Sequence, residues 1–128
     1  MGALLPLRNA RMAESAFAFF RGSAVVMAAD LAATPVSGIM VQACGDAHCM
    51  NFGGYATPER NVVFDVNDFD ETQPGPWEWD LKRLVTSVML AGRHNGFKSR
   101  ALASVTLATA AAYRKRIVQL GSMPALDV

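Results

Sequence analysis

The feature that most constrains this chain is the stretch 44–71, in which two polar clusters flank a turn. The first cluster lies in Cys-Gly-Asp-Ala-His-Cys-Met-Asn, and the second ends Val-Val-Phe-Asp-Val-Asn-Asp-Phe-Asp-Glu. Between them, residues 57–60 read Thr-Pro-Glu-Arg, a composition typical of a turn. Strands at 52–56 and 61–66 would then form a hairpin. Because hairpin strands are antiparallel, both clusters are expected at the same end of a small sheet.

Helical periodicity is predicted on both sides of this hairpin. Residues 8–34 carry apolar side chains at intervals of three and four, and Gly22 marks where that helix would divide. After residue 77, an apolar stripe with helical spacing predicts a long helix, formed by Leu81, Leu84, Val85, Val88 and Met89. Residues 97–120 predict a second long helix. Its expected buried side consists of Leu102, Val105, Thr109, Ala112, Tyr113, Ile117 and Leu120.

The remaining segments complete an α+β fold. The apolar run 39–44 predicts a buried strand, and Val62, Val63 and Phe64 are expected to form the core of the second hairpin strand. Residues 73–76, Gln-Pro-Gly-Pro, predict a rigid loop. The expected order is N-terminal helices, a small antiparallel hairpin sheet that carries the polar loop, and two long C-terminal helices.

Composition excludes some classes of function. The 128 residues form one domain or part of one, and the net charge of +1 does not favour nucleic-acid binding. No apolar run approaches the ~18 residues of a membrane span, so no membrane partner is expected. Residues 1–7 lack the basic start of a signal peptide. Cys44 and Cys49 are expected to be reduced thiols, which indicates a cytoplasmic protein.

Bound cations are suggested by the acidic residues. Six of the eleven Asp and Glu residues lie between residues 65 and 80. Such a local excess of carboxylate indicates a bound cation or a cationic partner, with a solvated acidic loop as the alternative. The Cys44-x3-His48-Cys49 pattern fits no common zinc spacing and has no evident fourth ligand, so zinc is disfavoured.

The polar clusters also have the spacing of a phosphoryl-transfer site. Such sites use an Asp that accepts a hydroxyl proton, an Asn five residues later that binds a metal, and a second metal-binding Asp after the next strand. Asp46 and Asn51 have this spacing, and Asp68 follows the second hairpin strand. Asp70, in the same Asp-Phe-Asp motif, is a further candidate metal ligand or a solvated loop residue.

Taken together, these motifs resemble known phosphotransferases. Gly-Asp-x-His-x-x-Asn, then Asp-Phe-Asp, then Pro-Trp-Glu-Trp-Asp-Leu is similar to the core of aminoglycoside and choline kinase-like enzymes. The resemblance implies that Asp46 is the catalytic base and that His48 orders the catalytic loop. It also implies that Asn51 and Asp68 bind the metal, and that Asp80 anchors the loop from below. Mg²⁺ and ATP are the implied cofactors.

More closely, residues 8–128 resemble the bacterial family catalogued as domain of unknown function 2252. The matching segments are Arg-Met at 11–12, Phe-Ala-Phe-Phe-Arg-Gly at 17–22, Gly-Asp-Ala-His at 45–48, Asn-Phe-Gly at 51–53, Phe-Asp-Val-Asn-Asp-Phe-Asp-Glu-Thr at 64–72 and Pro-Gly-Pro-Trp-Glu-Trp-Asp-Leu-Lys-Arg at 74–83. Arg21, in the second segment, could pair with the acidic cluster. Members of this family are longer and are grouped with kinase-like folds by resemblance.

The chain departs from the kinase pattern because it has no glycine-rich phosphate loop. The resemblance therefore implies a truncated member, with residues 1–128 forming a single partial kinase-like domain without its nucleotide-holding lobe. Its expected partners are the missing C-terminal part of the same protein and an acceptor that the sequence does not identify. Such a chain alone is expected to be inactive.

Three functions stay open at this point. The first is an Mg²⁺-dependent phosphotransferase segment that uses ATP or a related nucleotide. The second is a non-catalytic pseudoenzyme or binding domain, which the missing glycine-rich loop favours. The third is a metal-dependent phosphohydrolase, which a single His beside the Asp cluster supports least.

Overall fold

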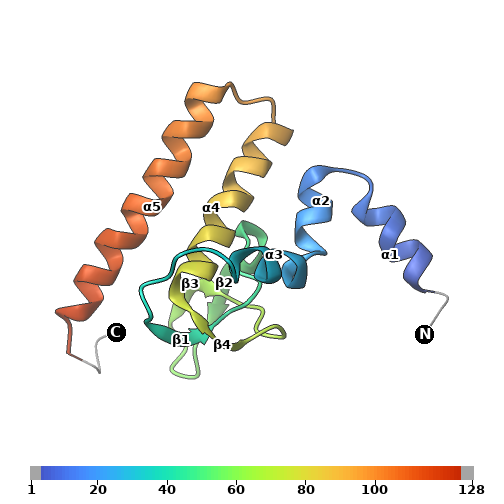
Figure 1. Cartoon of the computed structure of the whole chain (residues 1–128). Helices are drawn as coiled ribbons and strands as arrows, with labels where there is room; N and C mark the ends of the chain where they lie inside the picture. Colours follow the sequence, from blue (N-terminus) through green and yellow to red (C-terminus); the bar gives the residue numbers. More distant parts are fainter. Residues whose placement is uncertain (1–3, 125–128) are drawn as a thin grey trace.

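The computed structural model describes residues 4–124 and has the predicted α+β organisation (Figure 1). Its elements are α1 (Leu5–Met12), α2 (Ala16–Arg21), α3 (Ala24–Leu31), β1 (Met40–Ala43), the 3₁₀ helix η2 (Cys49–Asn51), β2 (Phe52–Ala56), β3 (Val62–Val66), β4 (Gln73–Pro76), α4 (Trp77–His94) and α5 (Ser99–Gly121). Figure 1 shows α4 and α5 side by side, with the strands near the start of α4. The short helices α1 and α2 lie on the opposite side of α4 from α5.

The N-terminal region forms three short helices. The predicted division at Gly22 is confirmed, because α2 ends at Arg21 and α3 begins at Ala24. A further break, between α1 and α2, was not predicted. It arises because Ser15 is extended and its hydroxyl accepts the Ala18 N–H at 3.0 Å, which starts a new helix.

Four strands form two separate antiparallel pairs. The predicted hairpin is confirmed, with β2 and β3 paired from Phe52 opposite Val66 to Ala56 opposite Val62. The prediction of a loop at residues 73–76 is wrong, because these residues form β4 and pair with β1. Proline lacks a backbone N–H, but a two-stranded sheet has only edge strands, and edge strands tolerate proline.

The two long helices pack against each other at both ends. Near the turn that joins them, a Cβ atom added to Gly92 would lie 2.6 Å from Leu102, so glycine allows close approach there. At the other end, the Trp77 ring stacks on Tyr113, with 5.7 Å between the ring centroids and an interplanar angle of 2°. The predicted long helices are thus confirmed, and the start of α4 is fixed against α5.

Several predictions of burial are wrong. In β1 only Ala43 is buried, and in β3 the side chains of Val62 and Phe64 are 83% and 75% exposed. On α5, Leu102 is buried, whereas Ala112 and Ile117 are exposed. The physical reason is that the outer faces of these strands and of α5 have no covering layer within residues 4–124.

Polar side chains are buried where the helices and the loop after β1 meet. Those with the lowest exposure are His48, Arg83 and Ser87, and Asn51 and Ser23 are also buried. Within residues 4–124, no helix combines the length and the apolar composition that crossing a membrane requires. The fold thus places a hydrogen-bonded polar centre between α2, α4 and the loop.

Candidate functional site

Asp80 holds the beginning of the polar loop. It lies in the first turn of α4, where the helix dipole favours a negative charge. Its carboxylate accepts the Cys44 N–H at 2.7 Å and the Gly45 N–H at 3.0 Å. Gly45 has a φ of 82°, and a Cβ atom there would lie 2.2 Å from the carbonyl oxygen of Glu71. The loop therefore turns sharply between the Asp80 carboxylate and the backbone that follows β3.

The next residue, Asp46, pairs with Arg83. The Oδ1 atom of Asp46 accepts hydrogen bonds from Nε of Arg83 at 2.6 Å and lies 2.5 Å from its Nη2. Nη2 also donates to the Phe20 carbonyl at 2.9 Å, and the guanidinium carbon lies 4.3 Å from the centroid of the Phe20 ring. Arg83 is only 2% exposed. This buried side chain joins α4, α2 and the loop, and it fixes the orientation of the Asp46 carboxylate.

His48 supports the other oxygen of Asp46. Its Nδ1 accepts the Met50 N–H at 3.2 Å, so the proton of the neutral ring is on Nε2. Nε2 lies 3.5 Å from Oδ2 of Asp46. Burial is the main cause that lowers the pKa of His48, and the charges of Arg21 and Arg83 lower it further against the opposing effect of Asp46. The ring is therefore neutral at pH 7 and directs an N–H toward the carboxylate.

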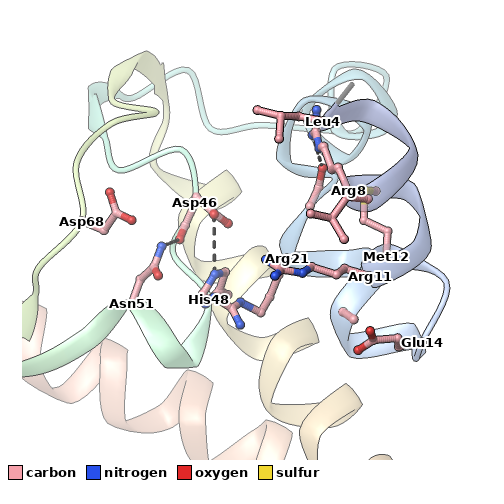
Figure 2. Close-up of a pocket in the computed structure, with 13 residues that line it drawn as sticks. Leu4, Arg8, Arg11, Met12, Glu14, Arg21, Asp46, His48, Asn51 and Asp68 are labelled. Carbon is pink, nitrogen blue, oxygen red and sulfur yellow. Dashed lines mark hydrogen bonds and ion pairs between the residues drawn. The ribbon is translucent and has the colours of Figure 1, made fainter. Parts of the chain in front are cut away.

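Asn51 and Asp68 come together through the hairpin. The Nδ2 atom of Asn51 donates to the Asp46 carbonyl at 2.9 Å, which leaves its Oδ1 available to other partners. The Asn51 carbonyl accepts the Asn67 N–H at 2.9 Å, so the chain after β3 lies beside Asn51. Figure 2 shows the Asp68 side chain next to Asn51, on the side of the loop that carries Asp46. The predicted meeting of the two polar clusters is thus present.

The oxygen atoms of Asn51 and Asp68 suit a hard cation such as Mg²⁺. Within residues 4–124, no group of three or more His, Cys, Asp or Glu side chains could hold a metal ion by itself. Mg²⁺ is usually bound by one or two carboxylates, together with water and phosphate oxygens of the substrate. The pair formed by Asn51 and Asp68 fits this partial type of site. Asp70 is exposed, and its N–H donates to Asp68 Oδ1 at 3.3 Å; its side chain does not line the cleft described next.

These residues form one side of a cleft of about 630 Å³. The other side is formed by α1 and α2, which contribute three arginines to the lining (Figure 2). Arg8 donates to the Gly22 carbonyl at 2.8 Å. The lining residues are Leu4, Leu7, Arg8, Arg11, Met12, Glu14, Ala18, Arg21, Gly22, Asp46, His48, Asn51 and Asp68. The cleft thus has side-chain oxygen atoms on one wall and guanidinium groups on the other.

A protein-family model described as "Uncharacterized protein conserved in bacteria (DUF2252)" matches residues 1–128. The chain belongs to this family. Comparisons with curated proteins and with solved structures gave no match. The family predicted from the sequence is therefore confirmed, whereas the kinase-like fold and the truncation stay predictions.

Two buried residues of this DUF2252 protein were not predicted as part of the site. Besides Arg83, Ser87 accepts the Cys49 N–H at 2.9 Å and donates to the Leu84 carbonyl at 2.7 Å. Asp80, Arg83 and Ser87 follow each other at intervals of three and four residues, so they share one face of α4. This polar stripe beside the apolar one is the signal that could have identified them.

The thiol of Cys44 also belongs to this loop. Its Sγ atom donates to the Asp68 carbonyl at 3.6 Å, and burial raises the pKa of the thiol. Cys44 is therefore protonated at neutral pH. It links the start of the loop to the segment after β3, so in this DUF2252 chain it supports the same loop as Asp80.

Proposed function

We propose that this chain carries the catalytic loop of a metal-dependent phosphotransferase, which moves a phosphoryl group from ATP or a related nucleotide to a hydroxyl group of an acceptor. The observation that carries the proposal is that Asp46, Asn51 and Asp68 line one cleft, opposite three arginines. Phosphoryl transfer requires mainly positioning and stabilisation of negative charge, and these residue types supply both.

In this proposal Asp46 accepts the proton of the acceptor hydroxyl. The new oxygen–phosphorus bond forms as the bond to the leaving phosphate breaks, and the leaving oxygen keeps the electron pair. Arg83 holds Oδ1 of Asp46, so Oδ2, which faces the His48 N–H, is the atom that receives the proton. His48 acts by orienting this carboxylate. Asn51 Oδ1 and the Asp68 carboxylate would hold Mg²⁺, which neutralises charge on the phosphate oxygens when it is bound.

The cation site is tested with the chain itself. Mn²⁺, a paramagnetic substitute for Mg²⁺, is titrated in the presence of ATP and followed by electron paramagnetic resonance. Asp68→Asn removes the only carboxylate of the pair and is expected to weaken Mn²⁺ binding about tenfold or more. A tenfold change in the dissociation constant corresponds to about 1.4 kcal/mol. Glu59→Gln, in the exposed hairpin turn, is the matched control and is expected to bind as the wild type does.

Turnover is tested by ³¹P NMR with Mg²⁺, ATP and a panel of hydroxyl-bearing small molecules, on this chain and on a longer family member with the same loop. Where transfer occurs, the variant equivalent to Asp46→Asn is expected to reduce the rate by about 10²–10⁴-fold, the usual contribution of a general base. Transfer at the wild-type rate in this variant would overturn the assignment of Asp46.

A non-catalytic binding domain is the second candidate. It is favoured by the contacts of Asp46, because Arg83 and His48 approach both carboxylate oxygens. This candidate predicts that ATP and Mn²⁺ bind without transfer in either protein. Release of phosphate without any nucleotide donor would instead favour the phosphohydrolase.

A further inference from the structure

We propose that Arg11 and Arg21 form an anion site that binds a phosphate group of the ligand, on the wall of the cleft opposite Asn51 and Asp68. This anion site rests on the proposed function, which identifies the cleft as the ligand site. It adds the chemical class of the ligand and the side on which its charged group lies. It also supplies, from α1 and α2, phosphate contacts that a glycine-rich loop would provide in a kinase.

The two arginines converge from different helices. Arg11 lies in the last turn of α1, and Arg21 is the last residue of α2. Figure 2 shows both side chains extending toward the loop that carries Asp46 and His48. The position of α2 is fixed, since Phe17 contacts His48 with 6.4 Å between ring centroids and the Phe20 carbonyl binds Arg83. The guanidinium of Arg21 is near enough to the imidazole of His48 to affect its titration.

Neither guanidinium has an anionic partner in the part of the chain that the structure describes. The ion pairs within residues 4–124 join Asp46 to His48 and to Arg83. Glu14 lines the same cleft but lies beyond ion-pair distance of the arginines. Arg8, by contrast, already donates to the Gly22 carbonyl. The two positive charges repel each other, and an anion bound between them would offset this repulsion because it attracts both guanidinium groups.

A phosphate group fits this arrangement better than a carboxylate does. The planar guanidinium donates two parallel N–H groups, which match phosphate and carboxylate oxygens alike, so the opposite wall of the cleft decides between the two anions. The opposite wall offers the Asn51 and Asp68 oxygens, which need a cation rather than an anion. A phosphate chain can bridge the two walls, because some of its oxygens accept from arginine while others bind Mg²⁺. A cleft of about 630 Å³ lies within the usual size range for small-molecule sites.

The test is calorimetric titration of pyrophosphate into the full chain without any metal ion. Arg11→Gln and Arg21→Gln are each expected to weaken pyrophosphate binding about tenfold or more, because each removes the hydrogen bonds between a charged guanidinium and the anion. Both residues are exposed, so the substitutions leave the fold intact, which far-UV circular dichroism verifies. Arg100→Gln, an exposed arginine on α5, is the control and is expected to bind as the wild type does. Arg11→Lys and Arg21→Lys retain the positive charge but lose the paired N–H groups of the guanidinium. Their affinity for pyrophosphate is expected to lie between those of the wild type and the glutamine variants.

Three results would overturn this anion site. They are the absence of pyrophosphate binding by the wild type, binding by either glutamine variant that is as tight as that of the wild type, and binding of malonate as tight as that of pyrophosphate. The outcome is separable from that of the proposed function. Asp68→Asn is not expected to weaken metal-free pyrophosphate binding, because it removes a negative charge from the cleft, but it is expected to weaken Mn²⁺ binding. The cation site and the anion site are therefore tested separately.

Discussion

At the residue scale, Arg83 has the largest number of distinct roles in the site. Its guanidinium pairs with Asp46, donates to the Phe20 carbonyl, lies over the Phe20 ring and contacts the Met27 sulfur at 3.6 Å. A buried charge is costly unless it is paired, and Asp46 provides the pair. The side chain is therefore both a structural connection and the element that orients the proposed base.

We predict that Arg83→Met lowers the free energy of unfolding by about 3–5 kcal/mol, the usual cost of removing one partner of a buried pair. Because methionine keeps much of the side-chain volume, the decrease in the free energy of unfolding reflects mainly the loss of the charge and of its hydrogen bonds. The measurement is urea unfolding, with Arg100→Met on α5 as the exposed control. A loss below about 1 kcal/mol, the value typical of surface pairs, would contradict the buried role.

We also predict that His48 makes stability depend on pH. Its pKa in the folded chain lies below the ordinary value of 6.5, mainly because it is buried. Above pH 6.5 the ring is neutral in both states, and its contribution to stability is fully present. As the pH falls below 6.5, the unfolded chain binds the proton first, so the free energy of unfolding decreases until the folded pKa is passed.

The pH effect is measured by urea unfolding at about pH 7.5 and about pH 5.5, with His48→Asn as the comparison. Asparagine keeps an acceptor for the Met50 N–H but does not titrate. The decrease in stability at the lower pH is expected to be larger in the wild type than in the variant. Other titrating groups are common to both proteins, so identical decreases would show that His48 is not buried in its neutral form.

At the scale of elements, the loop after β1 depends on a glycine. Gly45 and Gly96 both have positive φ angles, 82° and 75°. A Cβ atom at Gly45 would overlap the Glu71 carbonyl at 2.2 Å, whereas one at Gly96 would meet nothing within 4 Å. The two positions therefore share the backbone cost of a side chain in the left-handed region but differ in steric overlap.

We predict that Gly96→Ala costs about 1–2 kcal/mol and that Gly45→Ala costs about 1–3 kcal/mol more, the usual range for overpacking. Thermal or urea unfolding measures both. Gly45→Ala is also expected to weaken Mn²⁺ binding, because the loop that carries Asn51 must shift. Equal costs at the two glycines would mean that the close contact with Glu71 is absent in solution.

The elements show which parts of the fold could be predicted. The hairpin and α4 followed from alternation, turn residues and an apolar stripe. The strand β4 could not be recognised, because Pro74 and Pro76 argue against pairing unless the partner strand is known. An apolar run likewise predicts a strand but not what covers it, so the exposure of Val62 and Phe64 depends on tertiary structure.

The site could be predicted only in part, for a similar reason. Asp46, Asn51 and Asp68 are brought together by one hairpin, a local feature that turn residues indicate. Arg11 and Arg21 precede that hairpin by more than twenty residues, and only the packing of α2 against α4 brings them to the cleft. Arg83 was missed because a charged residue on a helix usually indicates a solvated surface.

At the scale of the whole molecule, the cleft joins two parts of the sequence with opposite charge. The helices α1 and α2 contribute arginines, and the segments that flank the hairpin contribute the side-chain oxygens of Asn51 and Asp68. The loop is held to α4 by Asp80, and α4 is held to α5 by the Trp77–Tyr113 stack. The long helices thus provide a rigid support on which one wall of the cleft is built.

One consequence concerns the length of the ligand. Arg83 binds Phe20 and Asp46 with the same guanidinium, and Arg21 directly follows Phe20 in the chain. The buried Arg83 side chain, together with the Phe17–His48 contact, therefore sets the spacing between the backbone at Arg21 and the loop. For a ligand that contacts both walls, this spacing limits the length of the part that bridges them. The cleft would then distinguish ligands by the length of their phosphate chain and not by the chemistry of the rest of the molecule.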